Sequence, residues 1–216
     1  MTPNSKFYNF CMTLTDLIVV NVLCVICCIP IFTIGASITA TYDCTLKMVR
    51  KEETAPIAKG FFKAFRANFK QATLLWLVFL AFGIFLVLDF FLISNNMEEG
   101  LARSWGLVLI AFAAVIYVCI LAYLFPLISH FENTGIQMVR NSLRLAVGKL
   151  LYTIPIVIMD LSPLLILFVP GDYLKWVFAL YVFIWFSGVA WLNSNMFRTI
   201  FDQLEENAAE SEGKNR

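Results

Sequence analysis

The amino-acid sequence predicts an all-α protein, a polytopic bundle of transmembrane helices, and three observations predict it. Hydrophobic residues make up 60% of the 216 residues and charged residues 14%, whereas soluble domains average about 45–50% and about 25%. The mean hydropathy is +0.79. The apolar residues gather in long runs separated by polar turns. We therefore expect one membrane domain over residues 1–193 and a cytoplasmic acidic tail over residues 194–216.

Five apolar runs have the composition of strong membrane spans. The first lacks a small-x-small cleavage site, so we expect it to remain as a span and not to be removed as a signal peptide. Each of the other four follows a polar or charged turn. The spans are expected at residues 14–30, 71–93, 104–128, 150–168 and 174–192.

Residues 36–50 are expected to form a separate, shorter helix, because Pro30 and Gly35 interrupt the chain before them. Its length of about 22 Å falls short of a hydrocarbon core about 30 Å thick. The segment is either a short, protein-buried membrane helix or a cytoplasmic helix. A weak repeat favours the first alternative, since residues 36–93 and 104–168 share the order of membrane helix, basic interfacial helix and span.

Residues 58–70 form a basic helix rich in phenylalanine, placed directly before a span. At about 100° per residue, its four cations share one side and its four phenylalanines occupy a separate sector. Such a helix is typical of the membrane interface, so we expect a lipid anchor; a docking helix for a cytoplasmic partner is the alternative. The anchor residues are Lys59, Lys63, Arg66, Lys70, Phe61, Phe62, Phe65 and Phe69.

Residues 135–149 predict a second amphipathic basic helix, also at the entrance of a span. Arg140 and Arg144 lie beside its apolar stripe. The stripe consists of Ile136, Val139, Leu143, Val147 and Leu150.

The distribution of positive charge predicts the orientation of the chain. Seven lysines and arginines lie in residues 47–70, one in residues 94–103 and three in residues 130–149. Cytoplasmic loops carry the excess of these residues. Both basic helices and the C-terminus are therefore expected in the cytoplasm, and the N-terminus as well if residues 36–50 cross the membrane.

Asp160 is the main candidate for a polar site inside the membrane. It lies 11 residues beyond Lys149, or about 16 Å along a helix. A carboxyl at this depth is costly unless it is paired, protonated or exposed to water. One interpretation is a proton or polar-ligand site. The other is a neutral acid hydrogen-bonded to another helix, through Asn21 of the first span or a tyrosine.

The sequence contains no arrangement of residues typical of an enzyme. It has no glycine-rich phosphate loop and no Ser/His/Asp set, and a single histidine cannot build a metal site. The Cys24-x-x-Cys27-Cys28 spacing lacks histidine or acidic partners, so packing accounts for it. We expect no enzymatic activity, cofactor or metal. The net charge of +1 gives no indication of nucleic-acid binding.

Two segments carry a resemblance to a known family. The first is Pro30-x-Phe32-Thr33-Ile34-Gly35-Ala36-Ser37 with Thr39-Ala40-x-Tyr42 and Leu46-Lys47-Met48-Val49-Arg50, and the second is residues 61–73. Both resemble the YesL family of bacterial membrane proteins, which has no established activity. Its members often lie beside genes for sugar-uptake ABC transporters. The resemblance implies an accessory role in carbohydrate uptake at the bacterial cytoplasmic membrane; a small-solute or proton-coupled transporter using Asp160 is the alternative.

Overall fold

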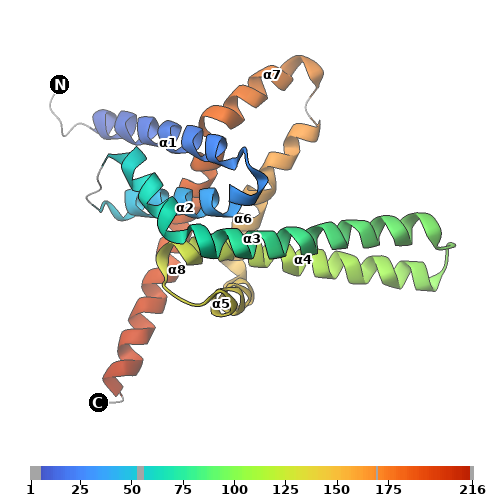
Figure 1. Ribbon diagram of the computed structural model, residues 1–216. Helices are drawn as coiled ribbons and strands as arrows, with labels where there is room; N and C mark the ends of the chain where they lie inside the picture. Colours follow the sequence, from blue (N-terminus) through green and yellow to red (C-terminus); the bar gives the residue numbers. More distant parts are fainter. Residues whose placement is uncertain (1–5, 53–55, 169, 215–216) are drawn as a thin grey trace.

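The computed structural model describes residues 6–52, 56–168 and 170–214, with side chains over most of that length. These residues are almost entirely helical and include no β-strand, so the all-α prediction is confirmed for them (Figure 1). Three short segments have other helical geometry: η1 (Ile31–Thr33) and η2 (Ser162–Phe168) are 3₁₀ turns, and η3 (Tyr181–Trp185) is a π turn. The α-helices are α1 (Lys6–Cys28), α2 (Ile34–Arg50), α3 (Ile57–Asn96), α4 (Leu101–His130), α5 (Gly135–Gly148), α6 (Leu150–Leu161), α7 (Gly171–Leu180) and α8 (Phe186–Lys214).

The short helix α2 lies at the centre of the fold. It packs against α1, α3, α4 and α8. Most of its side chains are buried and small, which lets neighbouring helices approach closely. The hydroxyls of Thr39, Thr41 and Thr45 each donate to the carbonyl four residues earlier, so this polar helix satisfies much of its own hydrogen bonding. Residues 36–50 are therefore part of a helix buried within the protein. This burial agrees with the first of the two alternatives given for this segment.

The turn between α1 and α2 is built around Pro30, which cannot continue a helix. Thr33 satisfies the carbonyls left free there: its hydroxyl donates to the Cys27 oxygen at 2.5 Å and to the Pro30 oxygen at 2.7 Å. The indole N–H of Trp76 on α3 donates to the Ile31 oxygen at 2.7 Å. The turn is thereby fixed against α3.

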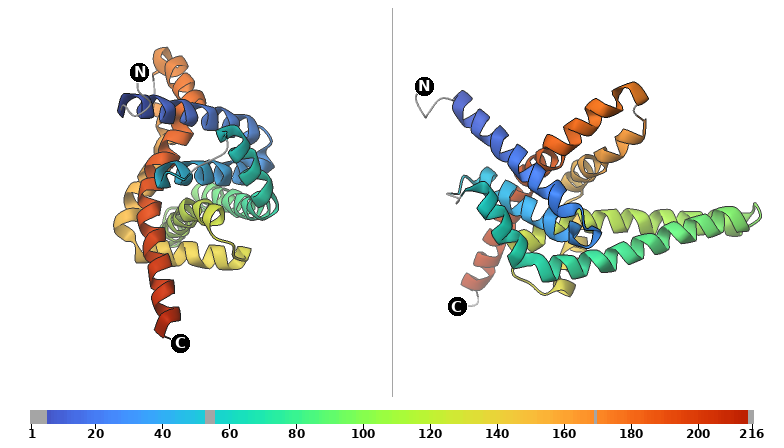
Figure 2. Two further views of the ribbon diagram at one scale, coloured as in Figure 1. Left: turned by 90° about the vertical axis from the view of Figure 1, so that its left-hand side faces the viewer. Right: turned by 45° about the horizontal axis from the view of Figure 1, so that its top comes forward.

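Helices α3 and α4 form a long hairpin that projects from the rest of the molecule (Figures 1 and 2). We expected an interfacial helix over 58–70 and a separate span over 71–93, but α3 is one continuous helix across both. Residues 68–74 contain no proline or glycine, so nothing in the sequence ends the helix there. The helix changes direction between its first turns and the hairpin, as Figure 1 shows.

The second basic helix, by contrast, is separated from its span. Helix α5 and residues Leu150–Ile166 meet at an angle of 109°. The predicted span over 150–168 is itself divided, because the α-helical part ends at Leu161 and a 3₁₀ turn follows at Ser162 and Pro163. The Tyr181 hydroxyl donates to the carbonyls of Ser162 and Pro163 at 3.2 and 3.1 Å, satisfying groups that this change leaves free.

The last helical stretch is longer than the predicted span 174–192. It runs from Gly171 through the π turn η3 and continues as α8 to Lys214. The described part of the predicted tail over 194–216 is thus helical, and its first turns pack in the protein core through Phe197, Ile200 and Phe201.

In the part of the chain that the structure describes, four helices are long and apolar enough to cross a membrane, or five if α5 and Leu150–Ile166 count as one broken span. These are features of a multi-pass membrane protein. The beginning of α1, the end of α2 and the end of α8 all lie on the side away from the tip of the α3–α4 hairpin (Figures 1 and 2). If α2 crosses the membrane, these three helix ends must lie on the same side, as they do here.

We predict that the N-terminus is cytoplasmic, because α2 returns the chain after Pro30. Reporters sensitive to membrane side, fused at residue 5 and after residue 33, should report the cytoplasm and the exterior respectively. A fusion at the C-terminus, expected in the cytoplasm, serves as the control. An external signal at residue 5 would show that α2 does not cross the membrane and that the chain has five spans.

Candidate functional site

A cavity of about 590 Å³ lies among α1, α2, α4, α6 and α8, with Trp76 of α3 and Trp185 of η3 on its wall. Its lining is mostly aliphatic and aromatic, and includes Ile38, Leu121, Phe125, Val189 and Ala190. Among the described residues, Asp160 is the one acidic residue on the wall. The candidate carboxyl therefore lines this cavity.

The Asp160 carboxyl is paired with Asn193 of α8. The Asn193 Nδ2 donates to Asp160 Oδ1 at 2.8 Å, and it also lies 3.4 Å from the Tyr42 hydroxyl. Asn193 is fully buried, and its Oδ1 has no hydrogen-bond partner. The Tyr42 hydroxyl also interacts with the Asp160 carboxyl. A tyrosine is one of the two expected partners, whereas Asn193 is a partner that the sequence does not single out.

Asn21 does not contact Asp160 through any described hydrogen bond, so the two predicted polar residues belong to different sites. Its Nδ2 donates to the carbonyls of Tyr181 and Val182 at 2.9 and 2.7 Å, and its Oδ1 accepts the Ser187 N–H at 2.8 Å. All of these groups lie in or beside the π turn η3. Asn21 thus joins α1 to a π turn, where it satisfies backbone groups beside the altered helix ladder.

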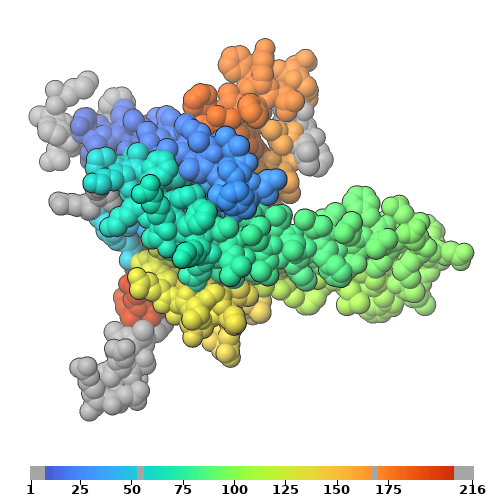
Figure 3. Space-filling model, in the orientation of Figure 1, coloured from blue at the N-terminus to red at the C-terminus, as the bar shows by residue number. Residues whose placement is uncertain are grey.

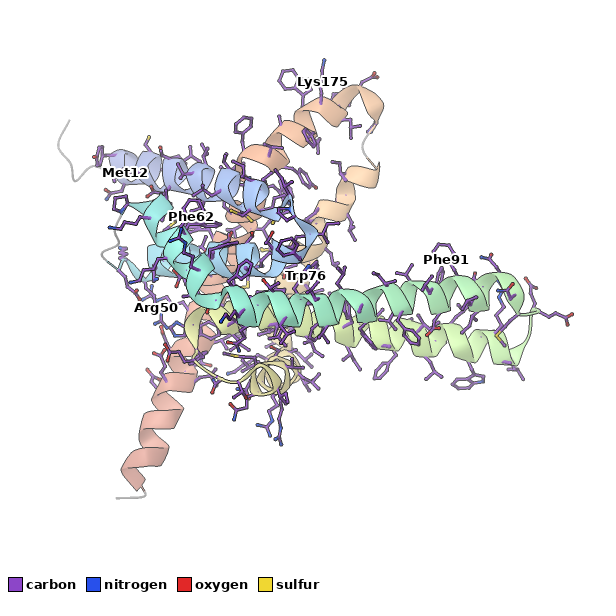
Figure 4. All side chains as sticks on the ribbon, viewed as in Figure 1. Met12, Arg50, Phe62, Trp76, Phe91 and Lys175 are labelled. Carbon is purple, nitrogen blue, oxygen red and sulfur yellow. The ribbon has the colours of Figure 1, made fainter. Side chains whose placement is uncertain are left out.

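The basic helix at the start of α3 exposes its four cations. Lys59, Lys63, Arg66 and Lys70 are all exposed. Phe62 is exposed as well, and Figure 4 labels it near the start of α3. These five side chains are available to an interface.

The other phenylalanines of this helix require a correction. Phe61 is fully buried in a cluster with Val20 and Cys24 of α1 and Ala40 of α2, so the anchor prediction is wrong for it. Phe65 and Phe69 are partly buried; Phe65 stacks on Phe61, and Phe69 contacts Phe65 at a tilted angle. The reason is that this face of the helix packs on α1 and α2, which a helical wheel of one segment cannot show.

Helix α5 orients most of its predicted stripe outward, although Val139 is partly buried and packs against the core. Ile136, Val147 and Leu143 are exposed, as are Arg140 and Arg144, while a different face packs against the core. The buried residues are Met138, Ser142 and Ala146. An exposed apolar stripe flanked by arginines is the surface expected of an interfacial helix.

Charged residues join the ends of several helices on the side that carries the C-terminus. Arg50 lies 2.9 Å from Asp202 and 3.6 Å from Glu205, and His130 Nε2 lies 2.7 Å from Glu205 Oε1. The hydrogen bond with His130, together with the charge of Arg50, lowers the pKa of Glu205, which lies beyond the apolar part of its helix. These contacts hold α2 and α4 onto α8.

The cysteines do not form a metal site in the described part of the chain. Cys24 and Cys28 lie on one face of α1 with their sulfur atoms 3.9 Å apart, and both line the cavity. No group of three or more His, Cys, Asp or Glu that could hold a metal ion occurs among the described residues.

Comparisons with known proteins give a family likeness without an activity. Residues 17–90 match the profile of a family described as "Protein of unknown function, DUF624". YteU of Bacillus subtilis (strain 168), described as an uncharacterized protein, is 25% identical over 142 residues, which is 65% of this chain and 63% of YteU. The chain thus spans less than two thirds of that relative. No solved structure matches. The family match covers most of α1, all of α2 and most of α3.

We predict that reversing the charge of the basic helix disturbs the orientation of the chain. Replacing Lys59, Lys63, Arg66 and Lys70 by Glu lowers the Lys/Arg count of residues 47–70 from seven to three. Reporter fusions at residues 98 and 216 should then report mixed sides, or the protein level should fall several-fold.

A matched set of variants separates the possible causes of that effect. The corresponding Gln variant should behave like the Glu variant, because acidic residues contribute little to orientation, and replacing the three lysines by Arg should change nothing. Unchanged topology and protein level in the Glu and Gln variants would show that this helix does not orient the chain.

Proposed function

We propose that this chain is a multi-pass protein of the bacterial cytoplasmic membrane, with its C-terminus inside. It acts there by association, as a non-enzymatic accessory or assembly partner of a carbohydrate ABC uptake system. The observation that carries the proposal is the exposed α3–α4 hairpin.

The hairpin presents large apolar side chains along most of its length. Figure 3 shows it projecting from the body of the molecule, and in Figure 4 the Phe91 side chain points away from that body. In a bilayer, such a surface meets lipid or the helices of another membrane protein. The exposed residues include Leu77, Phe85, Phe91, Leu101, Trp105 and Phe112.

The exposed cations at the start of α3 supply the lipid contact in this proposal. Each cation near an anionic membrane surface contributes about 1 kcal/mol, and four of them lie on this helix. The exposed stripe of α5 adds apolar contact on a second helix. Together they would hold the cytoplasmic side of the protein against the inner leaflet.

The carbohydrate part of the proposal rests on family likeness. The resemblance to the YesL family lies in residues 30–50 and 61–73, inside the region that matches the family of unknown function. YesL-like proteins carry this same domain, and their genes often lie beside those of sugar importers.

Affinity purification in mild detergent tests the association directly. Importer subunits should copurify with the protein, and deleting its gene should lower carbohydrate uptake only in cells that contain the importer. Replacing Phe91 and Phe112 by Ala should reduce copurification, while Leu151→Ala, at an exposed position of α6, should not. Sugar flux into liposomes that contain this protein alone would contradict the accessory role.

A transporter using Asp160 is the second candidate, and the cavity beside that carboxyl favours it. The lining argues against a sugar as its cargo, because each desolvated hydroxyl needs a hydrogen-bonding partner and the wall is mostly apolar. A proton or small-solute flux in proteoliposomes that Asp160→Asn abolishes would establish this candidate over the first.

A further inference from the structure

The cavity beside Asp160 suggests a ligand that neither proposed function requires. We propose that it binds one elongated apolar molecule with a single hydroxyl, a long-chain aliphatic alcohol or a neutral lipid of that kind, whose hydroxyl donates to the Asp160 carboxyl.

The walls fit an apolar body. A volume of about 590 Å³ lies within the range of roughly 300–1,000 Å³ that is usual for small-molecule pockets. Aliphatic and aromatic side chains from six α-helices form most of the surface. An occupant that filled this space with polar groups would leave most of them without partners.

To satisfy the polar groups on the wall, an occupant must offer both a hydrogen-bond donor and a hydrogen-bond acceptor. Asp160 Oδ1 already accepts one hydrogen bond from Asn193, but a carboxyl has room for several more. The indole N–H of Trp185, also on the wall, is buried without a partner. A hydroxyl group can both donate and accept a hydrogen bond, so an alcohol of suitable length offers a partner to either group.

A neutral head group suits this position better than a charged one. Bringing an ammonium group to Asp160 would bury an ion pair, and desolvating two charges offsets much of their attraction. Two uncharged side chains lie on the carboxyl, the amide of Asn193 and the hydroxyl of Tyr42. A hydroxyl gains a hydrogen bond there without that desolvation cost.

The opening of the cavity points to the bilayer as the source of the ligand. Ile29, Leu161 and Phe186 line the cavity and are also exposed at the molecular surface. All three are apolar and lie at or beside segments that we assign to the membrane. A molecule dissolved in the hydrocarbon core can therefore reach the cavity laterally.

Photolabelling tests this site in the full-length protein reconstituted into phosphatidylcholine vesicles. The probe is dodecanol with a diazirine in the middle of its chain, and labelled residues are mapped by mass spectrometry. We expect labels on Ile38, Leu121 and Val189 of the cavity, and a separate, lipid-derived background on the α3–α4 hairpin. Excess 1-dodecanol should reduce the cavity labels about tenfold, whereas the same concentration of dodecane, which lacks the hydroxyl, should reduce them only about threefold.

Variants locate the interaction. Val189→Trp fills the cavity without altering Asp160 and should abolish the cavity labels, while Leu109→Trp on the hairpin should leave them unchanged. Asp160→Leu removes the acceptor and should weaken labelling about fivefold, the value for one neutral hydrogen bond.

Three results would overturn the proposal, and none depends on the folding of the Asp160 variant. The first is labelling of the hairpin alone, which reports bulk partitioning. The second is equal competition by dodecane, which reports simple filling of apolar space. The third is unchanged cavity labelling in Val189→Trp.

Discussion

Replacing Gly35 by alanine should destabilise the protein by about 1–3 kcal/mol, the usual cost of overpacking a core. A methyl group at Gly35 would lie 2.6 Å from the Ala72 carbonyl oxygen, 2.6 Å from Trp76 Cβ and 3.0 Å from Phe125 Cε1. Two of these atoms are fixed to the α3 backbone, so a side-chain rotation cannot relieve the contact. Helix α3 would have to move away from α2, weakening the hydrogen bond from Trp76 to Ile31.

Heating in detergent, followed by the fraction of protein that still elutes as a single species, measures this effect. Gly60→Ala is the matched control, because nothing lies within 4 Å of a methyl group at that position. Alanine favours a helix over glycine by about 1 kcal/mol, so this control should be as stable as the parent or more stable. If both alanine variants melted alike, the close contact of α2 with α3 would not be present in the protein.

The sequence predicts the helices of this protein well because apolar runs and breakers act locally. Pro30 ends α1, the polar residues 97–100 form the turn of the hairpin, and Thr134 and Gln137 cap α5 in a capping box. The sequence does not predict the continuity of α3, because the signal used there is also a local one. The abrupt change of charge at Lys70 predicts a boundary there, but a helix ends only where its backbone is interrupted.

The candidate site was harder to predict because its partners come from distant parts of the chain. Asp160 was found from its depth in a span, whereas Asn193 lies just past the predicted end of the last span. A signal was present: Ala190, Asn193 and Phe197 fall on one helical face with buried residues on both sides. Following that face beyond residue 192 would have placed Asn193 in the core.

Asp160→Leu should destabilise the protein, whereas Asp160→Asn should not. Leucine leaves the fully buried Asn193 amide without the acceptor that now lies at 2.8 Å, and an unsatisfied buried polar group costs about 1–3 kcal/mol. Asparagine keeps an oxygen that can accept the same hydrogen bond. The heating assay used for Gly35 should therefore separate the two variants by several degrees.

The double variant Asp160→Leu with Asn193→Leu tests whether the pair itself causes the loss. Removing both partners leaves no orphaned group, so the double variant should recover part of the stability that either single change loses. Equal stability of Asp160→Leu and Asp160→Asn would show that the hydrogen bond with Asn193 contributes nothing. The Asn variant also separates the two functional candidates, because it keeps the bond and removes the titrating group. A proton or small-solute flux in proteoliposomes that a folded Asp160→Asn protein leaves unchanged would exclude proton transfer at this carboxyl and leave Asp160 a structural partner of α8.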